Sequence, residues 1–583
     1  MNDKVKVSDL IIDFFERKGI STIFLLSGGM MMHLLDSLGR SNKIKYVTNH
    51  HEQASCYSAE AYARVKDKVG VCFATSGPGA TNTITGITSA WVDSTPLMVL
   101  TGQSRTSLTA RGMGNRKIRM VGNFEVDIVE IVKPITKYSY FIDNPKSILY
   151  HLEKAYIHAT TGRPGPILLD IPLDIQSTMI LKNELLQYFP AKQLKHFNRN
   201  FQEVAHLLNL SKRPVILAGH GIQVSKSGLV FRKMIEKLKI PVITTQLGGG
   251  NLEYEHEMYV GKVGLRGDRA GNHAIQEADL IITLGTSLHV TTTGYNLEDF
   301  ATKAKLINVD LDENNLSKNK SVSDLQIKMD IKEFIIKILG FNIILAIDNW
   351  RQKLAQWKLD FQIINEPHKI IKDKINTYLL VNFLSEIAGE EDIITYDSGS
   401  LYYIMGQAFK SKKRQKIIAS GGLGAMGYAL PASIGVAFAE PKKNVICILG
   451  DGSLHTNIQE LSVIAKHKLN IKIIAINNDG YASIRNTQNA FMDGNLVASS
   501  NETGVSFPEW GKLCESYLIP HTKISKFSNL KNILAQELDE FGTKFFEIII
   551  PPEVELIPSV VSVKNEDGSF KSSKLDEMSP KIK

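Results

Sequence analysis

Two motifs in the last third of the sequence could together bind a divalent cation and a diphosphate. A Gly-Asp-Gly turn centred on Asp451 follows one apolar run, and a second apolar run leads to Asn478. Glycines at the end of a strand let a diphosphate approach the backbone, and the helix that follows offers free N–H groups. Mg2+ prefers oxygen ligands and keeps phosphate oxygens in its shell. We therefore expect Asp451, Asn478 and the carbonyl of Gly480 to bind Mg2+.

A carboxylate far upstream could supply a proton to the same ligand. Glu52 lies where a short strand-like run meets an alanine-rich helical segment. Taken alone, a glutamate at such a junction is most often a solvated charge favoured by the helix dipole, and a lone Gly-Asp-Gly is most often only a tight turn. A buried carboxylate can instead share a proton with a ring nitrogen. Because both motifs occur in one chain, we interpret both as parts of a cofactor site.

The elements that must position these residues form three α/β blocks. Short apolar runs alternate with amphipathic helical segments, a pattern typical of parallel sheets covered by helices. We expect three doubly wound parallel-sheet domains, at 1–180, 195–340 and 370–550, and a C-terminal arm at 551–583. The run at 309–312 is expected to end the middle sheet. The arm lacks periodicity, which leaves open both a disordered tail and an arm folded over the site.

The composition is that of a large globular enzyme. At 583 residues the chain is long for one core, and its 43% hydrophobic content argues against extensive disorder. A net charge of +8, spread along the chain, gives little support to nucleic-acid binding. The four cysteines lack the spacing of metal or redox motifs and are interpreted as reduced core residues. With no signal-like leader and no apolar run of membrane-spanning length, we expect a cytoplasmic protein that binds no membrane.

Further segments resemble those of the acetohydroxyacid (acetolactate) synthase and pyruvate oxidase group of thiamine diphosphate enzymes. They are SGG at 27–29, HEQ at 51–53, TSGPGATNTITGI at 75–87, DSTPLMVLTGQ at 93–103, DIVEIVKPITKY at 127–138 and GGLGAMGYALPASIG at 421–435. The resemblance covers nearly the whole chain and implies pyrimidine-binding, central and diphosphate-binding domains in that order. It implies thiamine diphosphate and Mg2+ as cofactors. It also implies a homodimer or homotetramer, because in this group the two cofactor-binding domains of one site come from different subunits.

The resemblance implies a role for each matching residue. Glu52 would protonate the aminopyrimidine ring of the cofactor, and Met426 would lie beneath the cofactor and force its bent shape. Gly28 and Gly29 would lie close to the reacting carbon, and Gln103 would border the pocket at the partner interface. Further cofactor contacts would come from Asn82, Gly399, Ser400, Gly424, Met426, Gly452 and Ser453, while Asp451, Asn478 and Gly480 would bind Mg2+. For Asn82, a simple role in a turn stays open.

Departures from the group bear on the substrate. The tryptophan-containing segment that follows the metal-binding asparagine in acetohydroxyacid synthases is absent, and NFE replaces FQE at 123–125. A basic run with Arg111, Arg116, Lys117 and Arg119 precedes that segment. The run is either an ordinary solvated loop or a place for a phosphorylated or nucleotide-bearing acceptor. The last residues resemble a branch associated with bacterial surface-sugar synthesis, in which the acceptor is a nucleotide-linked keto sugar.

The central block raises the question of a flavin. Glycine turns at 219–221, 247–250 and 264–267 occupy the places where some relatives bind FAD. The arginine-bearing stretch of those relatives is replaced by Thr-Ser-Leu-His at 286–289. Two interpretations stay open: FAD bound as a structural rather than a redox cofactor, or a central domain that is purely structural.

These features favour a carboligase that decarboxylates a 2-keto acid and transfers the acyl group to a second carbonyl. Pyruvate is the expected donor, and 2-acetolactate is the product if a second pyruvate is the acceptor. The alternatives are acetyl transfer to a nucleotide-linked keto sugar, simple decarboxylation or flavin-linked oxidation, and a non-catalytic scaffold. The intact Glu52, Asp451 and Asn478 argue against a scaffold, which would need none of these groups.

Overall fold

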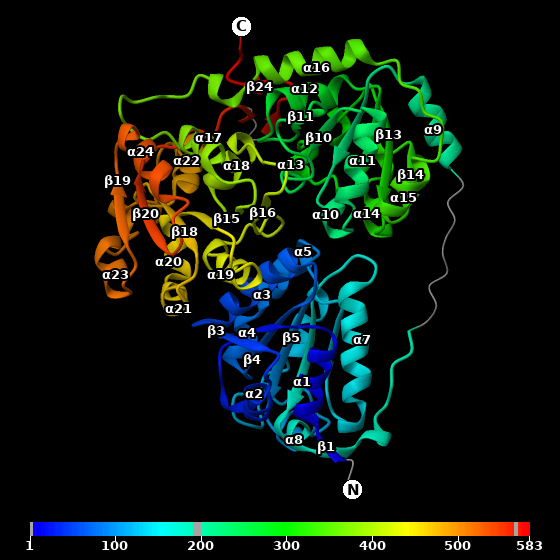
Figure 1. Cartoon of the computed structure of the whole chain (residues 1–583), viewed down its shortest axis with the longest axis vertical. Coiled ribbons are helices and arrows are strands. Elements are labelled where there is room, and N and C mark those ends of the chain that lie inside the picture. The colour runs from blue at the N-terminus through cyan, green and yellow to red at the C-terminus, as the bar shows by residue number, and fades with distance from the viewer. Residues whose placement is uncertain (1–3, 191–199, 565–569, 583) are drawn as a thin grey trace.

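The chain forms three parallel sheets of six strands each. The computed structural model describes residues 4–190, 200–564 and 570–582. In Figure 1 the N-terminal domain is blue and cyan, the central domain is green, and the C-terminal domain is yellow to orange. Among the described helices, none is both long enough and apolar enough to cross a membrane.

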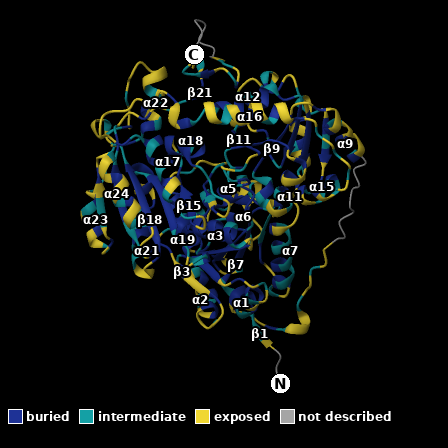
Figure 2. Cartoon of the chain, turned by 45° about the horizontal axis from the view of Figure 1, so that its top comes forward, coloured by how far each residue is buried: buried dark blue, intermediate teal, exposed yellow. Residues whose placement is uncertain are grey.

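Both faces of each sheet are buried, which explains the near-continuous apolar strands of the sequence. In the N-terminal sheet, Val99 belongs to one apolar cluster, whereas Met98 and Leu100 belong to a second cluster on the opposite face. Successive side chains of a strand point to opposite faces, so one strand contributes to both clusters. Figure 2 shows the result, with buried strands inside and exposed helix faces outside. The prediction of three doubly wound parallel-sheet domains is confirmed.

The N-terminal domain has the strand order β3-β2-β4-β5-β7-β6. Its sheet strands are β2 (Thr22–Leu25), β3 (Lys45–Thr48), β4 (Gly70–Ala74), β5 (Leu97–Gln103), β6 (Tyr138–Phe141) and β7 (Ile167–Pro172). Its helices are α1 (Val7–Arg17), α2 (Met32–Gly39), α3 (Glu52–Lys66), α4 (Pro78–Asn82), α5 (Ile84–Val92), α6 (Ile128–Val132), α7 (Ile148–Thr160) and α8 (Leu173–Ser177). A short antiparallel pair, β1 (Lys4–Lys6) and β8 (Met179–Leu181), joins the two ends of the domain.

The central domain has the strand order β11-β10-β9-β12-β13-β14. Its strands are β9 (Pro214–Ala218), β10 (Val242–Thr244), β11 (Tyr259–Lys262), β12 (Leu280–Leu284), β13 (Lys305–Asp310) and β14 (Leu325–Lys328). Its helices are α9 (Phe201–Leu210), α10 (Gly221–Val224), α11 (Gly228–Leu238), α12 (Arg269–Glu277), α13 (Val290–Thr293), α14 (Glu313–Lys318), α15 (Ile331–Ile338) and α16 (Asp348–Asp360). The expectation that 309–312 ends this sheet is wrong, because β14 pairs with β13 as a further edge strand.

The C-terminal domain has the strand order β16-β15-β17-β18-β20-β19. Its strands are β15 (Ile393–Tyr396), β16 (Lys416–Ile418), β17 (Val445–Gly450), β18 (Ile471–Asn477), β19 (His521–Ile524) and β20 (Lys544–Ile549). Its helices are α17 (Thr377–Ile387), α18 (Ser400–Ala408), α19 (Ala429–Ala439), α20 (Asp451–Thr456), α21 (Leu461–His467), α22 (Ala482–Phe491), α23 (Trp510–Ser516) and α24 (Phe527–Glu537).

Near the middle of each sheet, the chain reverses its direction of strand addition. The reversal lies between β2 and β4, between β9 and β12, and between β15 and β17. Ligands of open α/β sheets bind outside the carboxyl ends of the two strands at such a reversal. The glycine turns at 27–29, 219–221, 398–400 and 450–452 follow these strands. The topology therefore places glycine-rich turns at the reversal of all three sheets.

Helices α3 and α19 join the N-terminal and C-terminal domains. One apolar cluster contains residues of both helices, including Tyr57 and Ile434. A Cβ atom at Gly435 would lie 2.0 Å from the carbonyl oxygen of Ser58, so the helices approach too closely there for any other residue. The N-terminal turn of α3, which begins at Glu52, is thereby held against the C-terminal domain.

The C-terminal arm packs on the central domain. It contains two antiparallel pairs, β21 (Ser559–Val560) with β24 (Met578–Ser579) and β22 (Ser562–Lys564) with β23 (Phe570–Ser572). Val560, Leu575 and Met578 belong to an apolar cluster of the central domain. Part of the predicted arm, 565–569 and 583, lies outside the described residues. The described part of the arm is therefore folded, so the interpretation as a disordered tail is wrong for these residues. A cover over the site stays a prediction.

Candidate active site

The predicted metal-binding residues are brought together at the edge between β17 and β18. Asp451 begins α20 directly after β17, and Asn478 directly follows β18. One carboxylate oxygen of Asp451 accepts hydrogen bonds from the backbone N–H groups of Asn478 at 3.0 Å and Gly480 at 3.2 Å. The other accepts from the N–H of Gly452 at 2.7 Å. The turn after β17 and the turn after β18 therefore lie against each other.

The chemistry of this edge fits Mg2+. Asp451 is buried, and the burial raises the pKa of its carboxyl group to about 6 although three N–H groups donate to it. A nearby cation would favour the ionised form. Among the described residues, no three His, Cys, Asp or Glu side chains form a metal-binding group. An ion here would therefore be held by one carboxylate, an amide oxygen, a carbonyl oxygen and the oxygens of its ligand, the set that Mg2+ prefers.

The neighbouring turn after β15 fits a diphosphate. Strand β15 pairs with β17, so Gly399 and Ser400 lie beside the Asp451 turn. The hydroxyl of Ser400 is buried and has no hydrogen-bond partner among the described residues. Gly399 has a φ of 80°, and the space where its side chain would lie is open. An unpartnered donor beside open backbone suits a phosphate oxygen. Gly452 and Ser453, also predicted to contact the diphosphate, are buried in the first turn of α20.

The loop that carries Gly424 and Met426 is fixed at its base and exposed at its tip. Backbone N–H groups of Gly421 and Gly422 donate to Asp93 of the N-terminal domain at 3.1 and 2.8 Å. Gly424 has a φ of 67°, with no atom near the position of a Cβ. Met426 is 39% exposed, which is unusual for a large apolar side chain at the edge of a core. The exposed tip is therefore available to a ligand or to a second chain.

Glu52 is buried at the first position of α3 and is held by a second predicted residue. The side-chain amide of Asn82 donates to Glu52 Oε2 at 2.9 Å. A Cβ atom at Gly79 would lie 3.1 Å from Oε1, so a glycine leaves space beside that oxygen. Glu52 itself is only 5% exposed. The structure thus gives Asn82 an orienting contact with the carboxylate, and a buried, singly hydrogen-bonded carboxylate can serve in proton transfer.

The three other predicted residues lie near the reversal of the N-terminal sheet. Gly28 and Gly29 follow β2, and a Cβ atom at Gly28 would lie 2.4 Å from the side chain of Thr75. Gln103 is buried at the end of β5. Its amide nitrogen donates to Asp170 and to the carbonyl of Val126, both at 3.0 Å, and its oxygen accepts from the next N–H. All polar atoms of the Gln103 side chain thus form hydrogen bonds within the domain. Its expected place beside the pocket stays a prediction.

Arg485 is a residue that the sequence analysis missed. It is buried on α22, and its guanidinium donates to four carbonyl oxygens, those of Asn478, Asp479, Ser499 and Pro552, at 2.7–3.0 Å. These bonds fix the backbone of the predicted metal loop. No motif could have revealed this role, because the partners are backbone atoms of separate segments.

Asn457 and Glu460 were also missed. They lie in the short segment that follows α20 and contact the residues around Glu52. Burial raises the pKa of the Glu460 carboxyl group to about 7. The only signal for them in the sequence is weak, namely polar side chains at positions where a helix would bury them.

The basic run is partly neutralised within its own domain. Arg111 pairs with Asp127 at 2.9 Å, and Arg116 pairs with Glu130 at 3.0 Å. Lys117 is exposed, as is Arg119, and neither forms an ion pair with another described residue. The run is thus an exposed loop in which two of the four cations are already paired.

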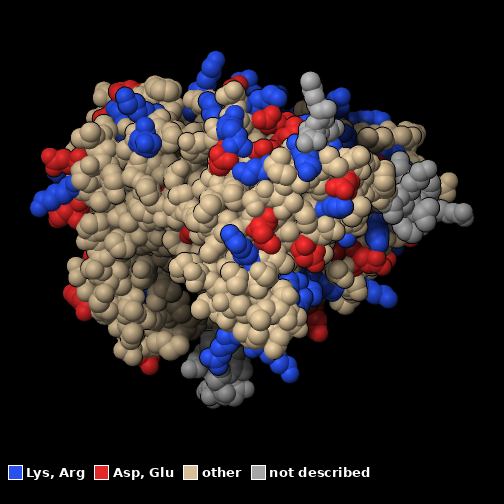
Figure 3. All heavy atoms as spheres, turned by 90° about the horizontal axis from the view of Figure 1, so that it is seen from below, with Lys and Arg blue, Asp and Glu red and all other residues tan. Residues whose placement is uncertain are grey.

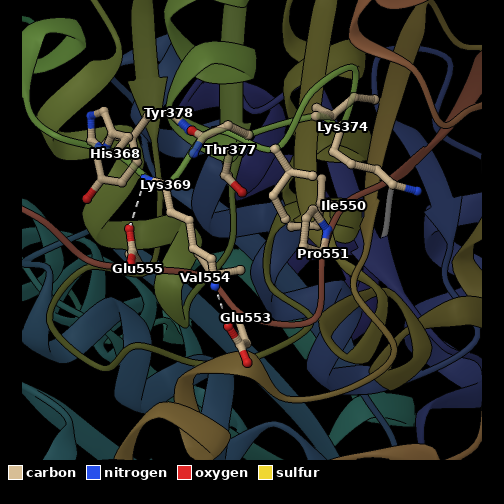
Figure 4. Close-up of a pocket in the computed structure, with 13 residues that line it drawn as sticks. His368, Lys369, Lys374, Thr377, Tyr378, Ile550, Pro551, Glu553, Val554 and Glu555 are labelled. Carbon is tan, nitrogen blue, oxygen red and sulfur yellow. Dashed lines mark hydrogen bonds and ion pairs between the residues drawn. The ribbon is translucent and has the colours of Figure 1, made fainter.

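A separate pocket lies behind the metal loop, between the segment 366–376, the start of α17 and the segment 550–555 (Figure 4). The ammonium group of Lys369 pairs with Glu553 at 3.4 Å, and its backbone N–H donates to Glu555 at 3.1 Å. The ring of His368 stacks on Tyr378 at a centroid distance of 4.3 Å. The pocket contains none of the predicted cofactor residues.

In the central domain, backbone packing alone accounts for the glycines of the turn at 219–221. The N–H of Gly219 donates to Leu284 and that of Gly221 donates to Gly285, both at 2.9 Å. A Cβ atom at Gly219 would lie 2.2 Å from the carbonyl oxygen of Gly285. Close backbone packing therefore requires these glycines whether or not FAD is bound, and flavin binding stays a prediction.

Comparisons with known proteins agree with the geometry over nearly the whole chain. Three domains of thiamine pyrophosphate enzymes match it: the N-terminal TPP binding domain at 5–121, the central domain at 201–338 and the C-terminal TPP binding domain at 397–548. Acetolactate synthase 1, chloroplastic, from Nicotiana tabacum is 31% identical, over 97% of this chain and 84% of its own.

Two microbial relatives are of similar length to this chain. The probable acetolactate synthase large subunit of Methanocaldococcus jannaschii is 34% identical over 95% of this chain and 93% of its own. The acetolactate synthase large subunit of Lactococcus lactis is 32% identical over 96% and 95%. The relatives match along the same three domains that the structure shows. The chain therefore belongs to the thiamine diphosphate enzymes, within the acetolactate synthase family.

Proposed function

We propose that the protein is a carboligase that depends on thiamine diphosphate and Mg2+. It would decarboxylate pyruvate and transfer the acyl group to a second carbonyl, giving 2-acetolactate when the acceptor is also pyruvate. The observation that carries this proposal is the buried Glu52 carboxylate, held by Asn82 with one oxygen beside open space. The relatives named as acetolactate synthases, which match over most of their length, support the choice of reaction.

When bound, thiamine diphosphate supplies a nucleophilic carbon that adds to a 2-keto acid and lets CO2 leave. The chain's own residues prepare that chemistry. Glu52 would hold a proton at the ring nitrogen of the ligand, and Asn82 keeps the carboxylate oriented for this task. Asp451, Asn478 and Gly480 would hold Mg2+, while Gly399, Ser400, Gly452 and Ser453 would receive the diphosphate. Met426 would support the ring.

A second copy of the chain would complete and cover the site. Large apolar side chains are exposed on the loop after β5 and on the loop before α19, namely Leu108, Met113, Met120, Phe124, Leu423 and Met426. A carboligase must exclude water from the reacting carbon, and in a single chain these side chains are exposed. Figure 3, a view from below, shows broad stretches without charged side chains. These observations support a homodimer, or a pair of homodimers, with sites at the interface.

A nucleotide-linked keto sugar is a second candidate acceptor. Lys117 and Arg119 are exposed cations that no described acidic residue neutralises, and the loop that carries them borders the N-terminal half of the site. A diphosphate-linked acceptor would gain charge-assisted hydrogen bonds there. FAD enters the proposal only as a structural cofactor of the central domain, and flavin absorbance of the purified protein would test it.

The reaction can be tested directly. Purified protein is incubated with thiamine diphosphate, Mg2+ and pyruvate, with and without a nucleotide-linked keto sugar, and the products are identified by mass spectrometry. We expect CO2 release and 2-acetolactate from pyruvate alone. A sugar adduct formed in preference would favour the second acceptor. Absence of CO2 release under both conditions would overturn the proposal.

A further inference from the structure

Asn457 lies where the three predicted cofactor segments meet. It follows α20, the helix that begins at Asp451, and it is only 1% exposed. Its side-chain nitrogen donates to Gln53 Oε1 at 3.1 Å and to the carbonyl oxygen of Gly427 at 2.7 Å. Gln53 is the residue after Glu52, and Gly427 is the residue after Met426. One amide group therefore links three segments that are far apart in the sequence.

The orientation of this amide is itself fixed. The side chain of Gln459 donates to Asn457 Oδ1 at 3.1 Å, so the oxygen faces a donor and the nitrogen faces two acceptors. Gly427 has a φ of 75°, and a Cβ atom there would lie 2.9 Å from the Asn457 nitrogen. The turn after Met426 thus packs directly on the end of α20. These contacts allow the amide group of Asn457 only one orientation.

A second contact of the same segment reinforces the link to Glu52. Glu460, fully buried three residues later, accepts from the N–H of His50 at 2.9 Å and from the side chain of Asn49 at 2.8 Å. The residues on both sides of Glu52 are therefore bonded to the segment after α20. That segment leaves the helix only six residues after Asp451.

We propose that Asn457 is a positioning residue: through its two donated hydrogen bonds it holds the start of α3, with Glu52, and the turn that carries Met426 in one fixed relation to α20. The proposal rests on the function proposed above for Glu52 and Met426. Asn457 itself touches neither of them. In the proposed dimer, Glu52 and Met426 of one chain belong to two different sites, so Asn457 holds one element of each site. An error of about 1 Å in the position of either element can cost ~10²-fold in rate.

The test uses hydrogen exchange of the full chain without cofactor, so that it does not depend on the reaction. Wild type is compared with Asn457→Asp, which keeps the shape but replaces the donor by an acceptor, and with Asn457→Ala. We expect exchange to rise roughly tenfold in peptides that cover 49–56 and 421–430 for both variants. In Gln53→Met only the first of these peptides should respond, because the bond to Gly427 remains.

Asn470 provides the matched control. It is a buried asparagine of the same domain, at the amino end of β18, and it bonds to Lys472 and to the N–H of Gly542. Asn470→Ala should lower the melting temperature without raising exchange in either peptide. Turnover, measured with cofactor bound, should fall ~10- to 100-fold in the Asn457 variants, with the Michaelis constant for pyruvate within a few-fold of wild type.

Three results would overturn the proposal. Unchanged exchange in both Asn457 variants would show that the bonds hold nothing in place. Wild-type behaviour of Asn457→Asp would make Asn457 a space-filling residue. Equal exchange in Asn470→Ala would show a general loss of stability. A wild-type protein without carboligase activity would instead refute the proposed function, and the exchange result would still decide the role of Asn457.

Discussion

The two carboxylates predicted to do chemistry are each held by residues of another element. Glu52 on α3 is oriented by Asn82 on α4, and the Asp451 carboxylate is bound by N–H groups after β18. Such contacts fix rotamers before any ligand arrives, and preorganisation of this kind is the main contribution of a protein to cofactor chemistry. The contacts also make the roles of single atoms testable.

Replacement of Glu52 by glutamine should separate proton transfer from binding. The amide keeps the size of the side chain but cannot deliver a proton, and a positioned acid or base contributes ~10²–10⁴ in rate. We expect turnover of pyruvate to fall within that range while thiamine diphosphate binding, followed by fluorescence, stays close to wild type. Glu440→Gln, at a solvent-facing pair with Lys66, is the control and should leave turnover unchanged. Wild-type turnover in Glu52→Gln would remove Glu52 from the mechanism.

At the residue scale, the sequence predicted groups whose partners are local in the motif. Asp451 and Asn478 could be found because the ends of two neighbouring strands meet. Asn457 and Arg485 could not be found, because their partners are carbonyl oxygens of segments that only the tertiary fold brings near. Side-chain identity says little about such bonds, since any segment offers a carbonyl oxygen.

At the element scale, the buried strands were predictable and the polar or isolated ones were not. The strands at the reversals are mostly apolar and almost entirely buried, because both of their faces are covered. Strand β14 alternates between buried and more exposed residues, as an edge strand does, and was missed. The arm was predicted, but its packing on the central domain was not, because Leu575 and Met578 are single apolar residues in a polar stretch.

The arm should depend on one buried ion pair. Arg269 on α12 pairs with Glu366 at 2.7 Å and donates to the carbonyl oxygens of Met578 and Pro580. Arg269→Met would leave a buried carboxylate without a partner, which costs ~3–5 kcal/mol. We expect the free energy of unfolding to fall by about that amount, with cleavage of the arm by added protease.

The double variant Arg269→Met with Glu366→Met serves as one control for this prediction. It should recover most of the loss, because neither charge remains buried alone. Arg351→Met is the second control, since Arg351 pairs with a highly exposed Asp348, and such pairs contribute only ~0–1 kcal/mol. Equal effects of Arg269→Met and Arg351→Met on the free energy of unfolding would show that the buried Arg269–Glu366 pair does not stabilise the arm.

At the scale of the whole molecule, three parallel six-stranded sheets bring glycine turns to three reversals, two of which lie in the cofactor-binding domains. The N-terminal and C-terminal sheets share one strand order, and the central sheet has another. Within one chain, α3 and α19 hold these two domains together through a shared core. The fold class followed from the alternation of strand and helix patterns. The assembly could not be derived in the same way, because residues that contact another chain do not recur at a regular spacing in the sequence. Such a surface is visible only in the structure, as exposed apolar side chains such as Phe124 and Met426.

Complementation between two inactive variants would test the proposed interfacial sites. Chains with Glu52→Gln and chains with Asp451→Ala carry different tags, are coexpressed, and the mixed dimer is purified by both tags. If each site combines Glu52 of one chain with Asp451 of the other, the mixed dimer has one intact site of its two. We then expect roughly half of the wild-type turnover per dimer, whereas either variant alone stays near background.

This expectation holds because the two mutated residues of one site lie on different subunits. In a mixed dimer, one site receives both replacements and the other receives neither, because a C2 interface exchanges the same surfaces in both directions. A dimer purified with two copies of Glu52→Gln under different tags controls for the tags and should stay inactive. An inactive mixed dimer of normal stability would place both groups of a site in one chain. A monomer in sedimentation experiments at working concentration would remove the interface from the proposal altogether, and the exposed loop around Met426 would then have to be covered by the chain itself.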